Sequence, residues 1–121
     1  MNDLQIRFEN AIKALRKDGL KIRQNIQKCC RGCITEEDLN MKDEEQPYGY
    51  TYGGQGFAIV WRDGQPWRKG SAWYRPTEPE ESVMFNWGNG SAEKIAEAFR
   101  AEGFEVEWDG SDFSCVEVKF S

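Results

Sequence analysis

The sequence predicts a single α+β domain over residues 1–121, with an N-terminal helix, an antiparallel β-meander, one further helix and a C-terminal β-hairpin. Three observations support this. A chain of 121 residues is the usual size of one domain. Apolar residues recur at helical spacing in two segments and alternate with polar residues in several others. Aromatic residues make up 13% of the chain, whereas disordered chains are normally poor in them.

The first 35 residues are predicted to form a basic helical segment. Its apolar face predicts a helix from about residue 4 to residue 17, with Asp3 as N-cap and Gly19 just beyond its end. The face consists of Leu4, Phe8, Ala11, Ile12 and Leu15. Residues 20–33 leave two alternatives open. Their apolar stripe fits a second helix, whereas the β-branched Ile22 and Ile26 suit an extended segment.

Residues 36–47 are predicted to form an acidic loop, and residues 48–121 the sheet and the second helix. Aromatic and β-branched runs predict strands at 48–52, 57–61, 71–75 and 83–87. Asp63-Gly64 is a preferred hairpin turn. Pro66 favours an edge position for the strand that follows the turn, and the two prolines of residues 76–81 favour a stiff acidic loop.

The C-terminal third predicts a helix followed by a hairpin. Ser91 is the expected N-cap, and Gly103 is placed for a left-handed C-cap. The apolar helix face consists of Ala92, Ile95, Ala96 and Phe99. Strict alternation then predicts strands at 104–108 and 114–120, with Glu105 and Glu107 exposed on one face.

Charge is distributed unevenly along the chain. The first 35 residues hold eight Lys and Arg and three acidic residues, a net charge of +5, whereas the remaining 86 residues carry −10. Nucleic acid is disfavoured as a ligand, because the overall charge is −5 and the basic stretch contains one aromatic residue, Phe8. A basic protein partner fits this charge better. The alternative is a basic helix packed beside an acidic sheet with solvated outer faces.

The four cysteines are candidate metal ligands. Cys30 and Cys33 have the spacing of a zinc or redox half-site, Cys29 is adjacent, and Cys115 is a distant fourth candidate. The alternative is that these residues are small buried hydrophobes of a helical stripe. The absence of histidine excludes imidazole general bases and every His-bearing metal site. Cofactors are therefore either none or zinc.

A second candidate site is a binding surface of tryptophan and arginine. The tryptophans at 61, 67 and 73 are six residues apart across two predicted turns, which could bring them together, and arginines accompany them. Trp and Arg are enriched among residues that dominate protein–protein binding. The candidate partner-binding residues are Trp61, Arg62, Trp67, Arg68, Trp73 and Arg75. The alternative is that the tryptophans belong to the core.

Several motifs together resemble a family of small bacterial and phage proteins that carry a domain of unknown function. They are Cys29-Cys30-x-x-Cys33, Trp87-Gly88 and the segment Gly103-Phe104-Glu105-Val106-Glu107-Trp108-Asp109-Gly110, within residues 5–118. The resemblance implies a fold and a cysteine motif, but it does not indicate a catalytic activity. Members often carry a histidine just after the third cysteine and another before a glutamine. This chain has neither, so any metal site built on them is in doubt.

The leading hypothesis is a small cytoplasmic, non-enzymatic module that binds a protein partner, as a phage- or prophage-encoded inhibitor or immunity-type protein. No apolar run reaches the roughly 18 residues that span a bilayer, and the N-terminus lacks the pattern of a secretory signal, so a membrane role is not expected. The alternative is a cysteine-based zinc-binding or redox-sensing module. The sequence leaves open whether the chain forms homo-oligomers.

Overall fold

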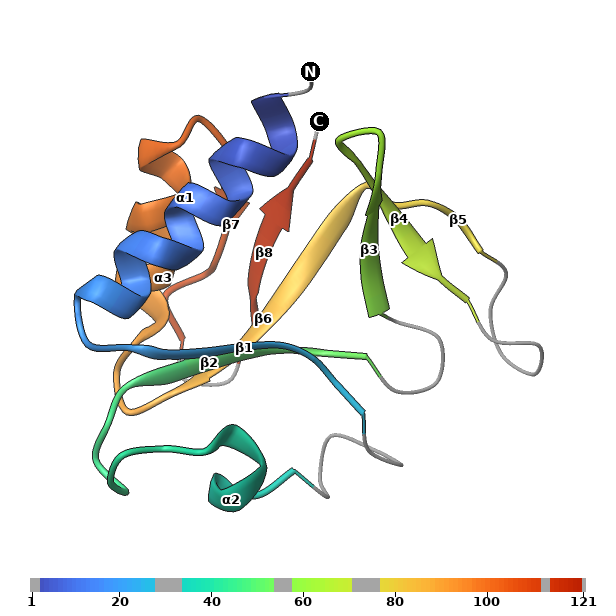
Figure 1. The fold of residues 1–121 in the computed structure, drawn as a ribbon. Helices are drawn as coiled ribbons and strands as arrows, with labels where there is room; N and C mark the ends of the chain where they lie inside the picture. The colour runs from blue at the N-terminus through green and yellow to red at the C-terminus, as the bar shows by residue number, and fades with distance from the viewer. Residues whose placement is uncertain (1–2, 28–33, 54–57, 71–76, 112–113, 121) are drawn as a thin grey trace.

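The computed structural model describes residues 3–27, 34–53, 58–70, 77–111 and 114–120 (Figure 1). Within these ranges it contains three helices and eight strands. In chain order they are α1 (Asp3–Lys17), β1 (Lys21–Ile26), α2 (Glu36–Leu39), β2 (Tyr48–Tyr52), β3 (Ala58–Arg62), β4 (Gln65–Lys69), β5 (Glu78–Pro79), β6 (Ser82–Gly88), α3 (Ala92–Ala101), β7 (Glu105–Glu107) and β8 (Val116–Lys119). The predicted α+β class is therefore confirmed. None of the described helices is long and apolar enough to cross a membrane.

The larger sheet has five strands in the order β1-β2-β6-β8-β7. Its pairs are antiparallel except β1 and β2, which are parallel. Of the two alternatives for residues 20–33, the extended one therefore holds for Lys21–Ile26. Gly19, at φ +92°, ends α1, and the Lys21 N–H donates to the Pro47 carbonyl at 2.9 Å. The prediction of a helical segment over residues 1–35 is therefore wrong for Lys21–Ile26, and residues 28–33 lie outside the described residues.

The expected meander is divided between two sheets. Strands β3, β4 and β5 form a separate three-stranded sheet, which lies in the chain between β2 and β6. The Asp63-Gly64 turn is confirmed, and both residues have positive φ, 52° and 77°. The edge position predicted from Pro66 is wrong, because β4 lies between β3 and β5. The two-residue β5 pairs with Trp67 and Arg68, so it does not require an N–H from Pro66.

Asn25 links the two sheets. It has φ 58° and lies at an irregularity in the β1–β2 register. Its side-chain amide donates to the Ile59 carbonyl at 2.9 Å and its Oδ1 accepts from the Ile59 N–H at 3.0 Å. The amide therefore pairs with the edge of β3 as a neighbouring peptide group would, while the Asn25 N–H donates to Thr51 Oγ1 at 2.8 Å.

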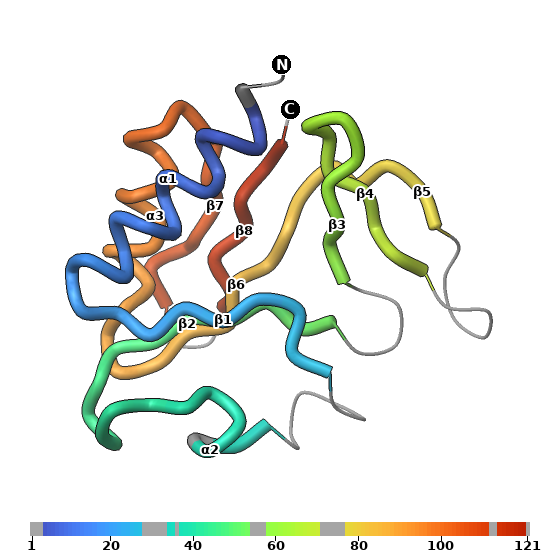
Figure 2. Tube along the Cα trace, viewed as in Figure 1, coloured from blue at the N-terminus to red at the C-terminus, as the bar shows by residue number. Residues whose placement is uncertain are grey.

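The main core lies between the larger sheet and two helices. Helices α1 and α3 lie side by side on one face of this sheet, as both views show (Figures 1 and 2). The apolar faces predicted for the two helices are buried, except that Leu4 at the start of α1 is only half-buried. Gly49 allows β2 to approach α3 closely, since a Cβ there would lie 2.6 Å from Ile95 Cδ1. The most buried large side chains are Phe85, Phe99, Ile22, Ile95, Val116 and Val118.

The ends of α3 differ from each other in how well they were predicted. Gly103 has φ +88°, and the Phe104 N–H donates to the Phe99 carbonyl at 3.1 Å, which confirms the predicted C-terminal stop. Ser91 precedes the helix but makes no side-chain capping bond. Its buried hydroxyl instead donates to the Tyr48 carbonyl at 2.5 Å, so this serine links α3 to β2.

Candidate binding groove

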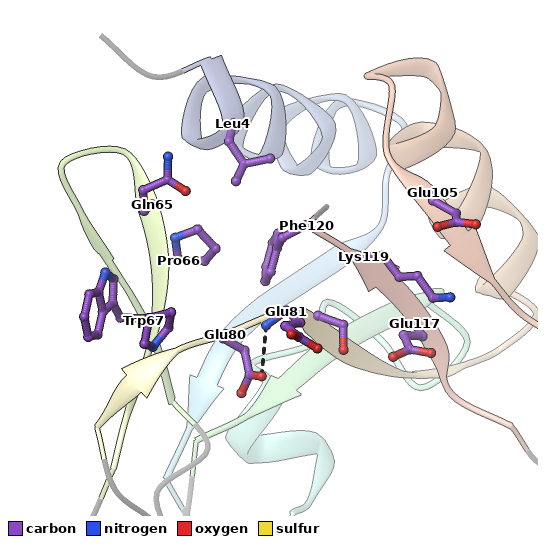
Figure 3. Close-up of a pocket in the computed structure, with 12 residues that line it drawn as sticks. Leu4, Gln65, Pro66, Trp67, Glu80, Glu81, Glu105, Glu117, Lys119 and Phe120 are labelled. Atoms are coloured by element: carbon purple, nitrogen blue, oxygen red, sulfur yellow. Dashed lines mark hydrogen bonds between the residues drawn. The ribbon is translucent and has the colours of Figure 1, made fainter.

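An open groove of about 710 Å³ lies between the smaller sheet and the end of the larger one (Figure 3). Its walls come from the start of α1, from β4 and β5, from the link between β5 and β6, and from β7 and β8. Segments far apart in the sequence therefore meet at this groove. The lining residues are Leu4, Gln65, Pro66, Trp67, Pro79, Glu80, Glu81, Ser82, Glu105, Glu117, Lys119 and Phe120.

One end of the groove is apolar. Leu4, Pro66 and Phe120 line it, and Figure 3 shows Pro66 and Leu4 close to the Phe120 ring. Phe120 is itself buried against the core, with its ring centroid 5.7 Å from Trp61 and 5.8 Å from Phe8. Its N–H donates to the Glu81 carbonyl at 2.8 Å, which attaches the end of the chain to the link between β5 and β6. This end is therefore rigidly supported.

The other end of the groove is acidic, and the alternation of β7 and β8 explains why. Val106, Val116 and Val118 are buried, so the residues between them face outward. The prediction that Glu105 and Glu107 are exposed is confirmed. In the β7–β8 register Glu105 lies opposite Lys119, and Glu107 lies opposite Glu117. These four charged residues thus form a block on the open face of the sheet.

Lys119 is the one cation among the groove's lining residues, and it is already paired. Its Nζ donates to Glu107 Oε1 at 2.7 Å. This hydrogen bond raises the pKa of Lys119 above its usual value, and the negative charges of Glu107, Glu105 and Glu117 add to the effect against the cost of desolvation. The positive charge of Lys119 is therefore balanced mainly by Glu107.

Three carboxylates of the groove lack a direct hydrogen-bonding or ion-pairing partner among the described residues. In the part of the chain that the structure describes, the side chains of Glu81, Glu105 and Glu117 make no hydrogen bond or ion pair. Glu80 differs, because its Oε2 lies 3.6 Å from Arg68 Nη1 and its Oε1 accepts from the Glu81 N–H at 3.1 Å. The groove thus presents a net negative charge beside an apolar end.

Arg68, a predicted partner-binding residue, is part of the internal structure. Only 5% of its surface is exposed, and its guanidinium is paired with Glu78 and Glu80. Since Arg68 lies opposite Glu78 in the β4–β5 register, this pair explains why the predicted acidic loop of residues 76–81 contains a strand. Its guanidinium is therefore not on the exposed surface.

The predicted tryptophan cluster is divided between the two faces of the smaller sheet. In the β3–β4 register Trp61 lies opposite Pro66, whereas Trp67 lies opposite Val60, so the two rings project from opposite faces. Trp61 packs against Phe8 at a centroid distance of 5.4 Å and joins the core. Trp67 lies under the Arg62 guanidinium, 4.9 Å from its ring centroid, and turns away from Phe120 in Figure 3. Trp73 and Arg75 are outside the described residues.

The predicted cysteine site falls largely outside the described residues, which contain Cys115 but not Cys29, Cys30 or Cys33. Cys115 is half-buried, and its Sγ donates to Asn86 Oδ1 at 3.3 Å. Among the described side chains no group of three His, Cys, Asp or Glu residues is arranged to hold a metal ion.

Sequence reasoning missed the groove as a site. Glu81, Glu117 and Phe120 were not candidate binding residues, although the alternation of residues 114–120 places Glu117 and Lys119 on one outward face. The missing information was tertiary, because the pairing of Ser82 with Lys119 and the hydrogen bond of Phe120 to Glu81 bring the acidic link to this face. No local pattern encodes that contact.

Comparison of the chain with protein-family models, curated proteins and solved structures finds no match. The resemblance to bacterial and phage proteins therefore stays a prediction from sequence motifs.

Proposed function

We propose that this chain is a non-enzymatic protein-interaction module that binds a basic protein partner through the groove. The observation that carries the proposal is the set of three unpaired carboxylates, Glu81, Glu105 and Glu117, beside a supported apolar end. A partner's cations would supply the counter-charge that Lys119 does not. Its apolar side chains would cover surface that now faces water.

The charge of the whole chain supports a basic partner. Residues 36–121 carry −10, and all of the groove's lining residues except Leu4 belong to that region. A field of one sign accelerates encounter with a partner of opposite charge and disfavours partners of like charge. An inhibitor or immunity-type protein benefits from both effects, because it must find its target quickly. The motif resemblance favours a phage or prophage origin and action in the cytoplasm.

The pair of Arg62, which is exposed, and Trp67, which is half-buried, borders this surface. Trp67 lies at the groove's edge and stacks under Arg62 on the outer face of the smaller sheet. Of the six predicted binding residues, Trp67 supports the proposal because it lines the groove. The pair is held by a cation–π contact, so little side-chain freedom would be lost on binding.

Partner capture from a host lysate with charge-matched variants tests this proposal. The groove variant combines Glu81→Gln, Glu105→Gln and Glu117→Gln. The control combines Glu37→Gln, Glu44→Gln and Glu97→Gln, three exposed residues away from the groove. Both variants have the same net charge, so only position differs.

We expect the wild type and the control variant to retain one stoichiometric partner at low salt and to lose it as salt rises. The groove variant should fail to retain it. Equal retention by the groove variant and the control, or the absence of any salt-sensitive partner, contradicts the proposed function.

A further inference from the structure

We infer that the groove receives an extended segment of the partner protein in which an apolar side chain is flanked by at least two lysine or arginine residues. This inference rests on the proposed function and specifies the partner that it requires. The segment's apolar side chain would lie against Leu4, Pro66 and Phe120, and its cations would reach separate carboxylates.

The apolar end defines the anchor. Pro66 and Phe120 are buried for most of their surface, and Leu4 is half-buried, so the remaining exposed patch is small and firmly backed. A patch of this size suits a single aliphatic side chain. Full burial of one such side chain contributes more free energy than an ion pair at the rim. The apolar side chain would therefore fix where the segment binds, and the ion pairs would favour basic segments over others.

The arrangement of the carboxylates defines the number of cations. On the β7–β8 block Lys119 bonds to Glu107 along one diagonal, which leaves Glu105 and Glu117 on the other. Diagonal neighbours of an antiparallel pair are roughly 7 Å apart. Glu81 comes from the link between β5 and β6, next to Ser82, which pairs with Lys119, and it lies between Glu80 and Glu117 in the view of Figure 3. Carboxylates that are spread in this way match several side-chain ammonium or guanidinium groups better than one metal ion, whose ligands converge on a single point.

A mutant cycle between the protein and a synthetic peptide tests the inference. The probe is a short blocked peptide in which two lysines flank one leucine, with companion peptides in which leucine is replaced by glycine or one lysine by glutamine. The protein variants are Leu4→Ala and Glu117→Gln, with Glu97→Gln as the control on α3. Affinities are measured by titration calorimetry at low salt, after thermal denaturation has shown that each variant is folded.

We expect Glu117→Gln to weaken binding of the parent peptide by roughly threefold or more, and to have a smaller effect on a peptide that lacks a lysine. Leu4→Ala should weaken binding of the leucine peptide but not of the glycine peptide. Additive effects in both cycles overturn the inference. So does binding of spermine, or of magnesium or zinc ions, with the same dependence on Glu117 as the peptide.

The two proposals fail in different ways. If partner capture depends on the groove carboxylates but no peptide binds or couples, the proposed function stands and the extended segment is wrong. If the peptide cycles couple but the captured partner ignores the groove variant, the groove binds basic segments but the partner uses another surface, which removes the proposed function. If neither depends on the groove, both proposals fall.

Discussion

The two halves of this molecule are stabilised in different ways. Where α1 and α3 cover the larger sheet, stability comes from apolar packing around residues such as Phe85 and Phe99, both fully buried. The smaller sheet is joined to the rest of the molecule by the amide of Asn25, which bonds to Ile59, and by the ring of Trp61. Within that sheet and its link to β6, Arg68 is held by ion pairs with Glu78 and Glu80. The groove lies at the boundary. The packed half thus forms one side of the groove, and the smaller sheet, which Asn25 and Trp61 hold in place, forms the other.

The largest expected effect tests the packed half. Phe85→Ala should lower the free energy of unfolding by about 3–5 kcal/mol, because it empties a fully buried ring site between α1, α3 and the sheet. The neighbouring Met84, which is 49% exposed, supplies the control, and Met84→Ala should change stability by no more than about 0.5 kcal/mol. Urea denaturation measures both. Similar losses for the two variants would show that the core is not where the structure places it.

A smaller effect tests the link between the halves. Asn25→Gly accepts the positive φ but removes the amide from the Ile59 N–H and carbonyl, which should cost roughly 1–3 kcal/mol. Asn25→Ala should cost about 1 kcal/mol more, because the left-handed conformation strains a side chain. Hydrogen exchange should accelerate at Ile59 while Val118 stays protected. Unchanged exchange at Ile59 in Asn25→Gly would mean that this amide does not hold the smaller sheet.

Lys119→Gln tests whether the positive charge of Lys119 opposes binding of a basic partner. The variant frees Glu107 and makes the groove more negative, so binding of the basic partner should strengthen by roughly two- to fivefold at low salt. Because the folded-state pKa of Lys119 is raised, its stabilising contribution is complete below the usual pKa of 10.5 and is lost as the pH rises through the folded-state pKa. The variant should therefore lose less stability than the wild type on alkaline titration. Weaker partner binding would show that Lys119 is itself a contact.

The smallest effect concerns the turn after β7. The backbone N–H and hydroxyl of Ser111, and the hydroxyl of Ser114, lower the pKa of Asp109 below its usual 3.8. A lowered folded-state pKa contributes stability above pH 3.8 that is lost as the pH falls through the folded-state value. Asp109→Asn should reduce the loss of stability on acidification in that range. Acid titrations of variant and wild type that run parallel would exclude this role.

The difference between local and long-range contacts explains which elements could be predicted from the sequence. Local patterns were enough for α1, α3, the Asp63-Gly64 turn and the β7–β8 alternation, because each depends on neighbours in the chain. They were not enough for β1, whose hydrogen bonds come from Pro47 and β2, or for β5, which depends on Arg68. Spacing was also not enough to place the tryptophans relative to one another. Spacing suggested that Trp61 and Trp67 cluster, but the hairpin register places them on opposite faces.

The most direct test of the central claim, that the groove is the binding surface, is hydrogen exchange of the chain with and without its captured partner. If the partner binds in the groove, hydrogen exchange should slow in β7, in β8 and in the link around Glu80 and Glu81. The outer surfaces of α1 and α3 should be unaffected. Protection confined to the helices, with none at the groove, would contradict the account.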